Sequence, residues 1–354
     1  MIFYALALLV TLGQTNFEDT QSSYREPLRE GRAEYAAGRF DSAEKLLAEA
    51  LKLLPQGDEA ERAKVLANLG TVYSRLEQFS KAEKAYSESL SIEKRLGDRN
   101  NCALMLHNLG MLYSIQGRDD DALRHLQQAQ ELIKFSPTAD GRVAAELLNG
   151  IGVIYYRRKN NGKAETYFNQ ALQMVSSSGI KFDTAGILNN LGAVYVGQHK
   201  YRQAEETLQR ALAIREADVG PSHPDLIPTL NATAVVYAET GRFAEAEDLY
   251  HRALAILEPQ SSSFAPAIAQ MLHGLSATYR RANRTVESDA ALEQAAQIAQ
   301  HNLDKEPEMA AIVDEYSQML RARGKTKEAE AVHNQASRAR TIEGLVIKAH
   351  SPPE

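Results

Sequence analysis

The sequence repeats itself about every 41 residues, and this period constrains the fold more than any other feature. A typical copy carries a Leu, a small residue directly after it, and a Tyr three residues further on. The small residue falls at Gly31, Gly70, Gly110, Gly152, Gly192, Ala234, Ser276 and Ser317. These eight in-phase copies cover residues 24–340, and the first and last match the pattern less well. Stacked repeats add length without adding separate cores, so 354 residues need not mean several domains.

A second small residue follows twelve positions after the first in every copy. It falls at Ala43, Ala82, Ala122, Ala164, Ala204, Ala246, Ser288 and Ala329. A bulky residue comes four positions later, at Tyr86, Leu126, Phe168, Leu208 and Tyr250. Spacings of three and four residues place such side chains on one helix face, and small residues let two helices approach closely. Gly38, Gly117 and Gly241 fall between the two halves, where a turn is expected. Each copy therefore predicts a pair of antiparallel helices, with Ala164 and Ala204 at tight contacts between them.

This pattern resembles the tetratricopeptide repeat, whose signature of Leu-Gly, Tyr, Ala and Phe recurs with a period of about 34 residues. The longer period here, and the segment HPDLIPTLNATAVVYAETGRFAEAEDLYHRALAI at 223–256, resemble the kinesin-light-chain-like subclass. The resemblance implies an all-α fold, a right-handed superhelical solenoid of about eight antiparallel helix pairs. It also implies a scaffold that binds other proteins, because the family is used in this way in many unrelated settings.

The N-terminus indicates an export signal. Residues 2–12 are apolar apart from Thr11, too short a run for a membrane span of about 20 residues. It matches the apolar region of a secretory signal, although no Lys or Arg precedes it. We expect a signal peptide at 1–13, a polar linker at 14–23 and a C-terminal tail at 341–354. The expected location is then periplasmic or extracellular. The alternative is an apolar segment that packs on the first repeat of a cytoplasmic protein.

Composition and motifs argue against several classes of function. A net charge of −6 is unlike that of proteins that bind nucleic acid through phosphate contacts. The single cysteine, Cys102, excludes an internal disulfide and a cysteine-rich zinc site, and we expect a partly buried free thiol. The sequence has no His-Glu-x-x-His, no glycine-rich phosphate loop and no Gly-x-Ser-x-Gly. We therefore predict neither an enzyme nor a cofactor.

The resemblance places positions 2, 5, 6, 9, 12 and 13 of each repeat on a concave inner groove, with the first small residue as position 8. Amides recur at positions 5 and 6, beside His107 and His273: they are Asn68, Asn108, Asn149, Asn189, Asn190 and Asn231. A primary amide can bond both the C=O and the N–H of a peptide, so such a series can hold an extended backbone. The series is interrupted at Gly150 and Ala232, and the alternative is local capping.

The same positions carry more basic than acidic residues. The basic ones are Arg25, Arg29, Arg32, Lys64, Arg75, Arg157, Arg280, Arg281 and Arg321, and the acidic ones are Glu146, Glu239, Asp314 and Glu315. Nine minus four gives +5, opposite in sign to the −6 of the whole chain, which favours an acidic ligand. The alternative is an ordinary solvated surface. A clamp for a terminal carboxylate, which needs Lys and Asn at positions 5 and 9, is not predicted, because the first repeat has Leu28 and Arg32 there.

These features lead to one main hypothesis and two alternatives. The main one is a non-enzymatic scaffold that binds an extended, acidic polypeptide segment in its groove. The first alternative is an assembly protein of an envelope complex that uses its convex or terminal surfaces. The second is an accessory subunit of an enzyme or regulator. The partner is expected to be a protein or peptide, without nucleic acid or a stable membrane span, and the sequence leaves the oligomeric state open.

Overall fold

The structure is a computed structural model that describes residues 23–134, 141–178, 183–258, 264–304 and 306–349, the last eight of these by their backbone alone. Within these ranges all regular elements are helical, which confirms the predicted all-α repeat fold. The predicted signal peptide at 1–13 and the linker, apart from Ser23, lie outside the described residues. The last helix continues to Ala349, past residue 340, where the repeat pattern ends.

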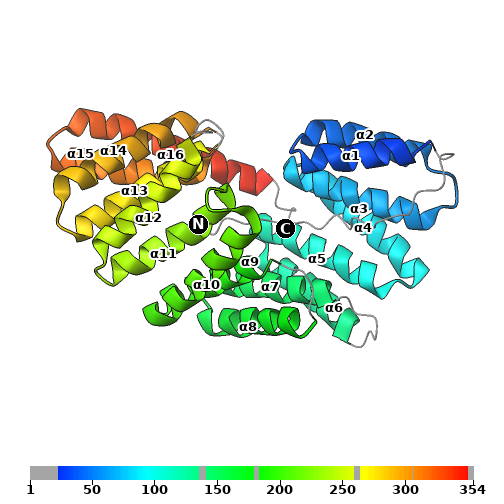
Figure 1. The fold of residues 1–354 in the computed structure, drawn as a ribbon. Helices are drawn as coiled ribbons and strands as arrows, with labels where there is room; N and C mark the ends of the chain where they lie inside the picture. The colour runs from blue at the N-terminus through cyan, green and yellow to red at the C-terminus, as the bar shows by residue number, and fades with distance from the viewer. Residues whose placement is uncertain (1–22, 135–140, 179–182, 259–263, 305, 350–354) are drawn as a thin grey trace. The chain divides into compact units, whose positions relative to one another are not determined.

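The chain divides into two compact units, which join in the sequence at residues 182 and 183. The N-terminal unit contains α1 (Arg25–Ala36), α2 (Phe40–Leu53), α3 (Glu59–Arg75), α4 (Phe79–Leu96), α5 (Arg99–Ile115), α6 (Asp119–Lys134), α7 (Gly141–Arg157) and α8 (Asn161–Ser178). The C-terminal unit contains α9 (Thr184–Gly197), α10 (Tyr201–Val219), α11 (Ile227–Glu239), α12 (Phe243–Leu257), α13 (Ala265–Arg281), α14 (Thr285–Asn302), α15 (Ala310–Ala322) and α16 (Thr326–Ala349). Two short 3-10 helices, η1 (Pro224–Leu226) and η3 (Pro307–Met309), precede α11 and α15. Within each unit, odd and even helices form successive pairs that stack on one another (Figure 1).

A left-handed residue closes the turn inside every pair. Gly38, Gly117, Gly241 and Gly324 have φ between 74° and 79°, as expected for a helix-ending glycine. Four other residues take the same conformation at the equivalent place, with φ of 57° or 58°, and they are Glu77, Lys159, His199 and Asn283. The next residue then donates back to a carbonyl five positions earlier, as Arg118 N does to Tyr113 O at 2.8 Å. The turn is thus fixed by backbone hydrogen bonds even where glycine is absent.

The two small residues of each repeat lie in the seam between the paired helices, as the sequence predicts. A Cβ added at Gly110 would lie 2.8 Å from Leu126 Cγ and 3.1 Å from the carbonyl oxygen of Ala122. Ala164 and Ala204 have no exposed surface, which confirms their predicted burial. The close approach of the two helices therefore depends on the small residues at these positions.

Serines take over both small positions in the α13–α14 pair. Ser276 Oγ donates to the carbonyl of Ser288 at 2.8 Å, and Ser288 Oγ donates to the carbonyl of Ser276 at 2.9 Å. Both hydroxyls are buried and satisfied by each other's backbone. At its two small positions this pair of helices is therefore joined by hydrogen bonds as well as by close packing.

Candidate functional site

The first two amides of the predicted series lie deep in the N-terminal unit. Asn68 on α3 and Asn108 on α5 are 7% and 4% exposed. Asn68 Nδ2 is buried and has no hydrogen-bond partner among the residues described. Asn108 Oδ1 lies 3.3 Å from His107 Nδ1. A buried donor without a partner costs about 1–3 kcal/mol, so Asn68 is the member of the series that a ligand acceptor would stabilise most.

His107 and Gly150 explain the interruption of the amide series. A Cβ at Gly150 on α7 would lie 3.2 Å from Met111 Sδ and 3.7 Å from His107 Nε2. Because Gly150 has no side chain, α7 can lie against α5, where it covers His107; this histidine is 8% exposed. Burial lowers the pKa of His107 to about 4, so this imidazole is neutral near pH 7. No pattern in the sequence indicates this pKa shift, because the shift depends on α7, which packs over His107.

The remaining amides are divided between the two units. Asn149 lies in the N-terminal unit, on α7, whereas Asn189 and Asn190 on α9 and Asn231 on α11 belong to the C-terminal unit. All four are half-buried. Asn149 and Asn190 take part in polar contacts, whereas Asn189 Oδ1 is buried without a partner among the described residues.

Three predicted cations of the first two repeats remain available for a ligand. Arg29 is exposed, and Arg32 is half-buried with its Nε shielded and without a partner among the described residues. Burial lowers the pKa of Arg32, and the charge of Glu61 acts in the opposite direction. The Arg75 guanidinium lies 5.2 Å from the centre of the Phe40 ring. Lys64 differs, because its Nζ pairs with Glu61 Oε1 at 2.6 Å.

Three further predicted cations are held by ion pairs inside the units. Arg157 donates to Ser114 O at 2.6 Å and to Asp119 Oδ1 at 2.7 Å. Arg281 bonds Glu239 Oε1 at 2.6 Å. Arg280 and His273 both bond Glu315, with His273 Nε2 at 2.7 Å from Oε2. His273 first, and then Arg280, lower the pKa of Glu315 to about 2. These three cations are therefore paired, but Glu239 and Glu315 already stand in the count of +5, so among the three only the pair of Arg157 with Asp119 reduces the excess counted from sequence.

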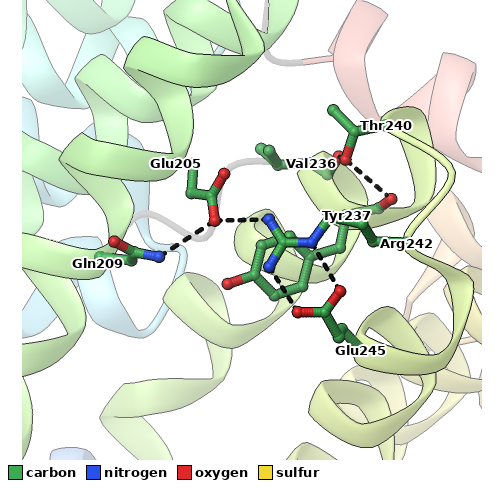
Figure 2. Close-up of polar contacts among 7 residues, drawn as sticks. All are labelled: Glu205, Gln209, Val236, Tyr237, Thr240, Arg242 and Glu245. Atoms are coloured by element: carbon green, nitrogen blue, oxygen red, sulfur yellow. Dashed lines mark hydrogen bonds and ion pairs between the residues drawn. The ribbon is translucent and has the colours of Figure 1, made fainter.

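An inter-repeat clamp, which the sequence reasoning missed, joins α12 to the preceding repeat (Figure 2). Arg242 bonds Glu205 of α10 at 2.7 Å and Glu245 of its own helix at 2.5 and 2.6 Å. Its guanidinium also lies 3.8 Å from the centre of the Tyr237 ring. Hydrogen bonds to the two carboxylates raise the pKa of Arg242. One repeat later, Arg284 bonds Glu247 at 2.6 Å over the ring of Tyr279. The recurrence of Arg and Glu 42 residues apart was the available sequence signal.

Other site classes find no support in the described part of the chain. No three His, Cys, Asp or Glu side chains gather there in a way that could hold a metal ion. Cys102 is a free cysteine, as expected, but it is buried rather than partly buried, and burial raises the pKa of its thiol. Among the helices that the structure describes, none has the length and apolar character needed to cross a membrane.

Stacked antiparallel helix pairs define a helical-repeat protein. Residues 26–95, 101–177 and 183–258, more than half of the chain, match the family model of the tetratricopeptide repeat. The chain therefore belongs to the tetratricopeptide-repeat family, and its repeats are of the kinesin-light-chain-like kind. This family supports a role as a protein-interaction scaffold.

Known proteins resemble the chain at low identity. Protein KINESIN LIGHT CHAIN-RELATED 2 of Arabidopsis thaliana is 24% identical over 233 residues, which are 63% of this chain and 34% of that protein. The chain thus spans about a third of this relative's length. BtubC from P. vanneervenii has a TM-score of 0.55 at 20% identity, covering 62% of this chain and 90% of BtubC. A Rap protein complexed with competence and sporulation factor has a TM-score of 0.58 at 18% identity, covering 80% and 76%. These structural likenesses show the fold alone.

Proposed function

We propose that the chain is a non-enzymatic scaffold that binds an extended, acidic polypeptide segment along the first helices of its N-terminal unit. The observation that carries the proposal is the unpaired Nδ2 of Asn68, in a side chain that is 7% exposed. A ligand carbonyl or carboxylate that reached this nitrogen would remove the cost of an unpaired donor.

The cations on the first helices of this unit support an acidic ligand. Arg29 and Arg32 lie on α1, and Arg75 ends α3. Arg32 loses solvation on burial and has no ion-pair partner among the described residues, so a ligand carboxylate would stabilise it. In the C-terminal unit, by contrast, Arg280 and Arg281 already have carboxylate partners. The N-terminal unit is therefore the better candidate of the two.

Fluorescence anisotropy with labelled peptides tests this proposal. The probes are three blocked twelve-residue peptides of Gly and Ser with Glu, Lys or Gln at every third position. We expect the Glu peptide to bind most tightly, with an affinity that falls as salt rises, because screening acts over about 10 Å at 0.1 M salt. Asn68→Ala and the double variant Arg29→Glu, Arg32→Glu should weaken it.

A charge-matched control separates local from global electrostatics. Lys45→Glu with Lys52→Glu makes the same change in net charge on α2, the second helix of the same repeat, where both lysines are exposed. This control should retain most of the binding. Equal losses in both double variants, or equal binding of all three peptides, would contradict the proposal and favour the assembly-protein alternative.

Export also remains a prediction. Sequencing the N-terminus of the native protein tests it, and recovery of Met1 on the mature chain would contradict cleavage after Gly13.

A further inference from the structure

A cavity of about 790 Å³ lies in the C-terminal unit between α12, α13 and α14. Leu254, Ile268 and Ile298 give it apolar walls, and Glu258 and Gln294 also line it. It belongs to the C-terminal unit, so it is separate from the site proposed above on the first helices of the N-terminal unit.

The junction between α10 and α12 lies one repeat earlier, and it shows which contacts are made at the equivalent position. Arg252 on α12 bonds Glu216 on α10 at 2.5 Å and the carbonyl of Pro221 at 2.9 Å. Leu226 of η1, at the start of the intervening first helix, has no exposed surface. An arginine that reaches across the two second helices therefore completes this junction.

The residues of the cavity are the repeat equivalents of that arrangement. Counting one repeat of 42 residues forward, Glu216 corresponds to Glu258, Arg252 to Gln294 and Leu226 to Ile268. The acid is retained, but glutamine stands where the arginine would be. Ile268 is accordingly left partly exposed in the cavity wall, in contrast to fully buried Leu226.

Among the described residues, no Lys or Arg side chain pairs with Glu258 in the way that Arg252 pairs with Glu216. Among them Glu258 has no ion pair, and the connecting sequence 259–263, PQSSS, contains no basic residue. The imidazoles that line the cavity are His251, which lies 3.7 Å from Glu247, and His301, whose Nδ1 bonds the carbonyl of Gln297 at 2.7 Å. A carboxylate thus lies beside an apolar cavity at the position where the neighbouring junction has an Arg–Glu pair.

We propose that this cavity takes an arginine side chain of a partner polypeptide, with the guanidinium on Glu258 and the aliphatic stem against Ile268 and Ile298. An arginine combines an apolar stem with a fixed fork of donors, so it fits an apolar wall that ends at a carboxylate. The bound side chain would reproduce, from outside, the contact that Arg252 makes within the chain.

Methyl NMR of the full chain tests the proposal with a defined probe, the blocked peptide acetyl-Leu-Arg-Leu-amide. We expect saturable shifts of the Ile268 and Ile298 methyl signals. The same peptide with citrulline, which keeps the shape but lacks the charge, should bind about five- to tenfold more weakly, in keeping with a charge-assisted hydrogen bond at a partly exposed site.

Two variants address the site from the protein side. Glu258→Gln should weaken the arginine peptide by the same factor and leave the citrulline peptide unchanged. Gln294→Arg should supply the missing guanidinium internally, raise the melting temperature and abolish binding. Its control is Gln335→Arg, the same change at the same repeat position of α16. There the residue equivalent to Glu258 is Gln300, so the new arginine meets no carboxylate at that position. Equal binding of both peptides, or full binding to Gln294→Arg, would overturn the proposal.

Discussion

Gly70 on α3 lies so close to Tyr86 on α4 that a Cβ at residue 70 would be 2.6 Å from Tyr86 Cε1. Tyr86 has no exposed surface, and its hydroxyl donates to Thr71 Oγ1 at 3.1 Å, so the ring is fixed by packing and by a hydrogen bond. Gly70→Ala should therefore destabilise the N-terminal unit by about 1–3 kcal/mol through overpacking. Urea unfolding measures this. Gly162→Ala on α8 is the control, because nothing lies within 4 Å of its added Cβ, and it should be neutral or stabilising.

At Gly117 the effect of backbone conformation on stability can be measured without a change in packing. Its φ is 74°, but a Cβ there would meet nothing within 4 Å. Gly117→Ala should cost about 1 kcal/mol, because the left-handed conformation is strained for a residue with a Cβ. At Glu77, which has the same conformation with φ of 57°, the change to Gly should be neutral or stabilising. A loss of stability in Glu77→Gly equal to that in Gly117→Ala would contradict this account of the turn.

His107 should make the N-terminal unit sensitive to acid. Its pKa in the fold is about 4, below the ordinary value of 6.5, so the unfolded chain takes up the proton first as pH falls. The stability contributed by neutral His107 is complete above pH 6.5 and is lost as pH falls towards 4, up to about 3 kcal/mol. His107→Gln should remove this part of the pH dependence. Denaturant titrations at pH 7, 6 and 5 compare the two proteins, and parallel curves would show that His107 is not buried in neutral form.

Arg242 should couple two repeats of the C-terminal unit. Arg242→Met keeps an apolar stem over Tyr237 but removes the bonds to Glu205 and Glu245, so the melting temperature should fall. This difference in melting temperature should be smaller in high salt, because salt screens the ion pairs that stabilise the parent protein. Arg202→Met is the control, since Arg202 is 92% exposed and pairs with Glu206 on its own helix. Differential scanning calorimetry that finds equal shifts for both variants would argue against the clamp.

The fold was predictable because helix packing leaves a periodic trace in the sequence. Gly70, Gly110, Gly152 and Gly192 each meet the side chain sixteen residues later, so each contact recurs once per repeat. The division into two units was not predicted, because the repeat pattern continues in phase through residue 182.

The candidate site was predictable only as a set of positions. Arg281 and Glu239 were counted as separate groove charges, yet they form an ion pair between successive first helices. Partners of this kind lie about one repeat apart in sequence, and whether two side chains meet depends on rotamers and helix spacing. The burial of Asn68 and His107 likewise depends on neighbouring helices, which no single repeat encodes.

The clamp at Arg242 also has a consequence for how the chain can vary in length. Each block of 42 residues in this region carries an arginine that faces the preceding repeat and an acid that faces the following one, as Arg242 with Glu205 and Arg284 with Glu247 show. An in-register duplication of such a block would therefore place this arginine and this acid opposite each other again at the new junction, so that the clamp itself is preserved when a repeat is added.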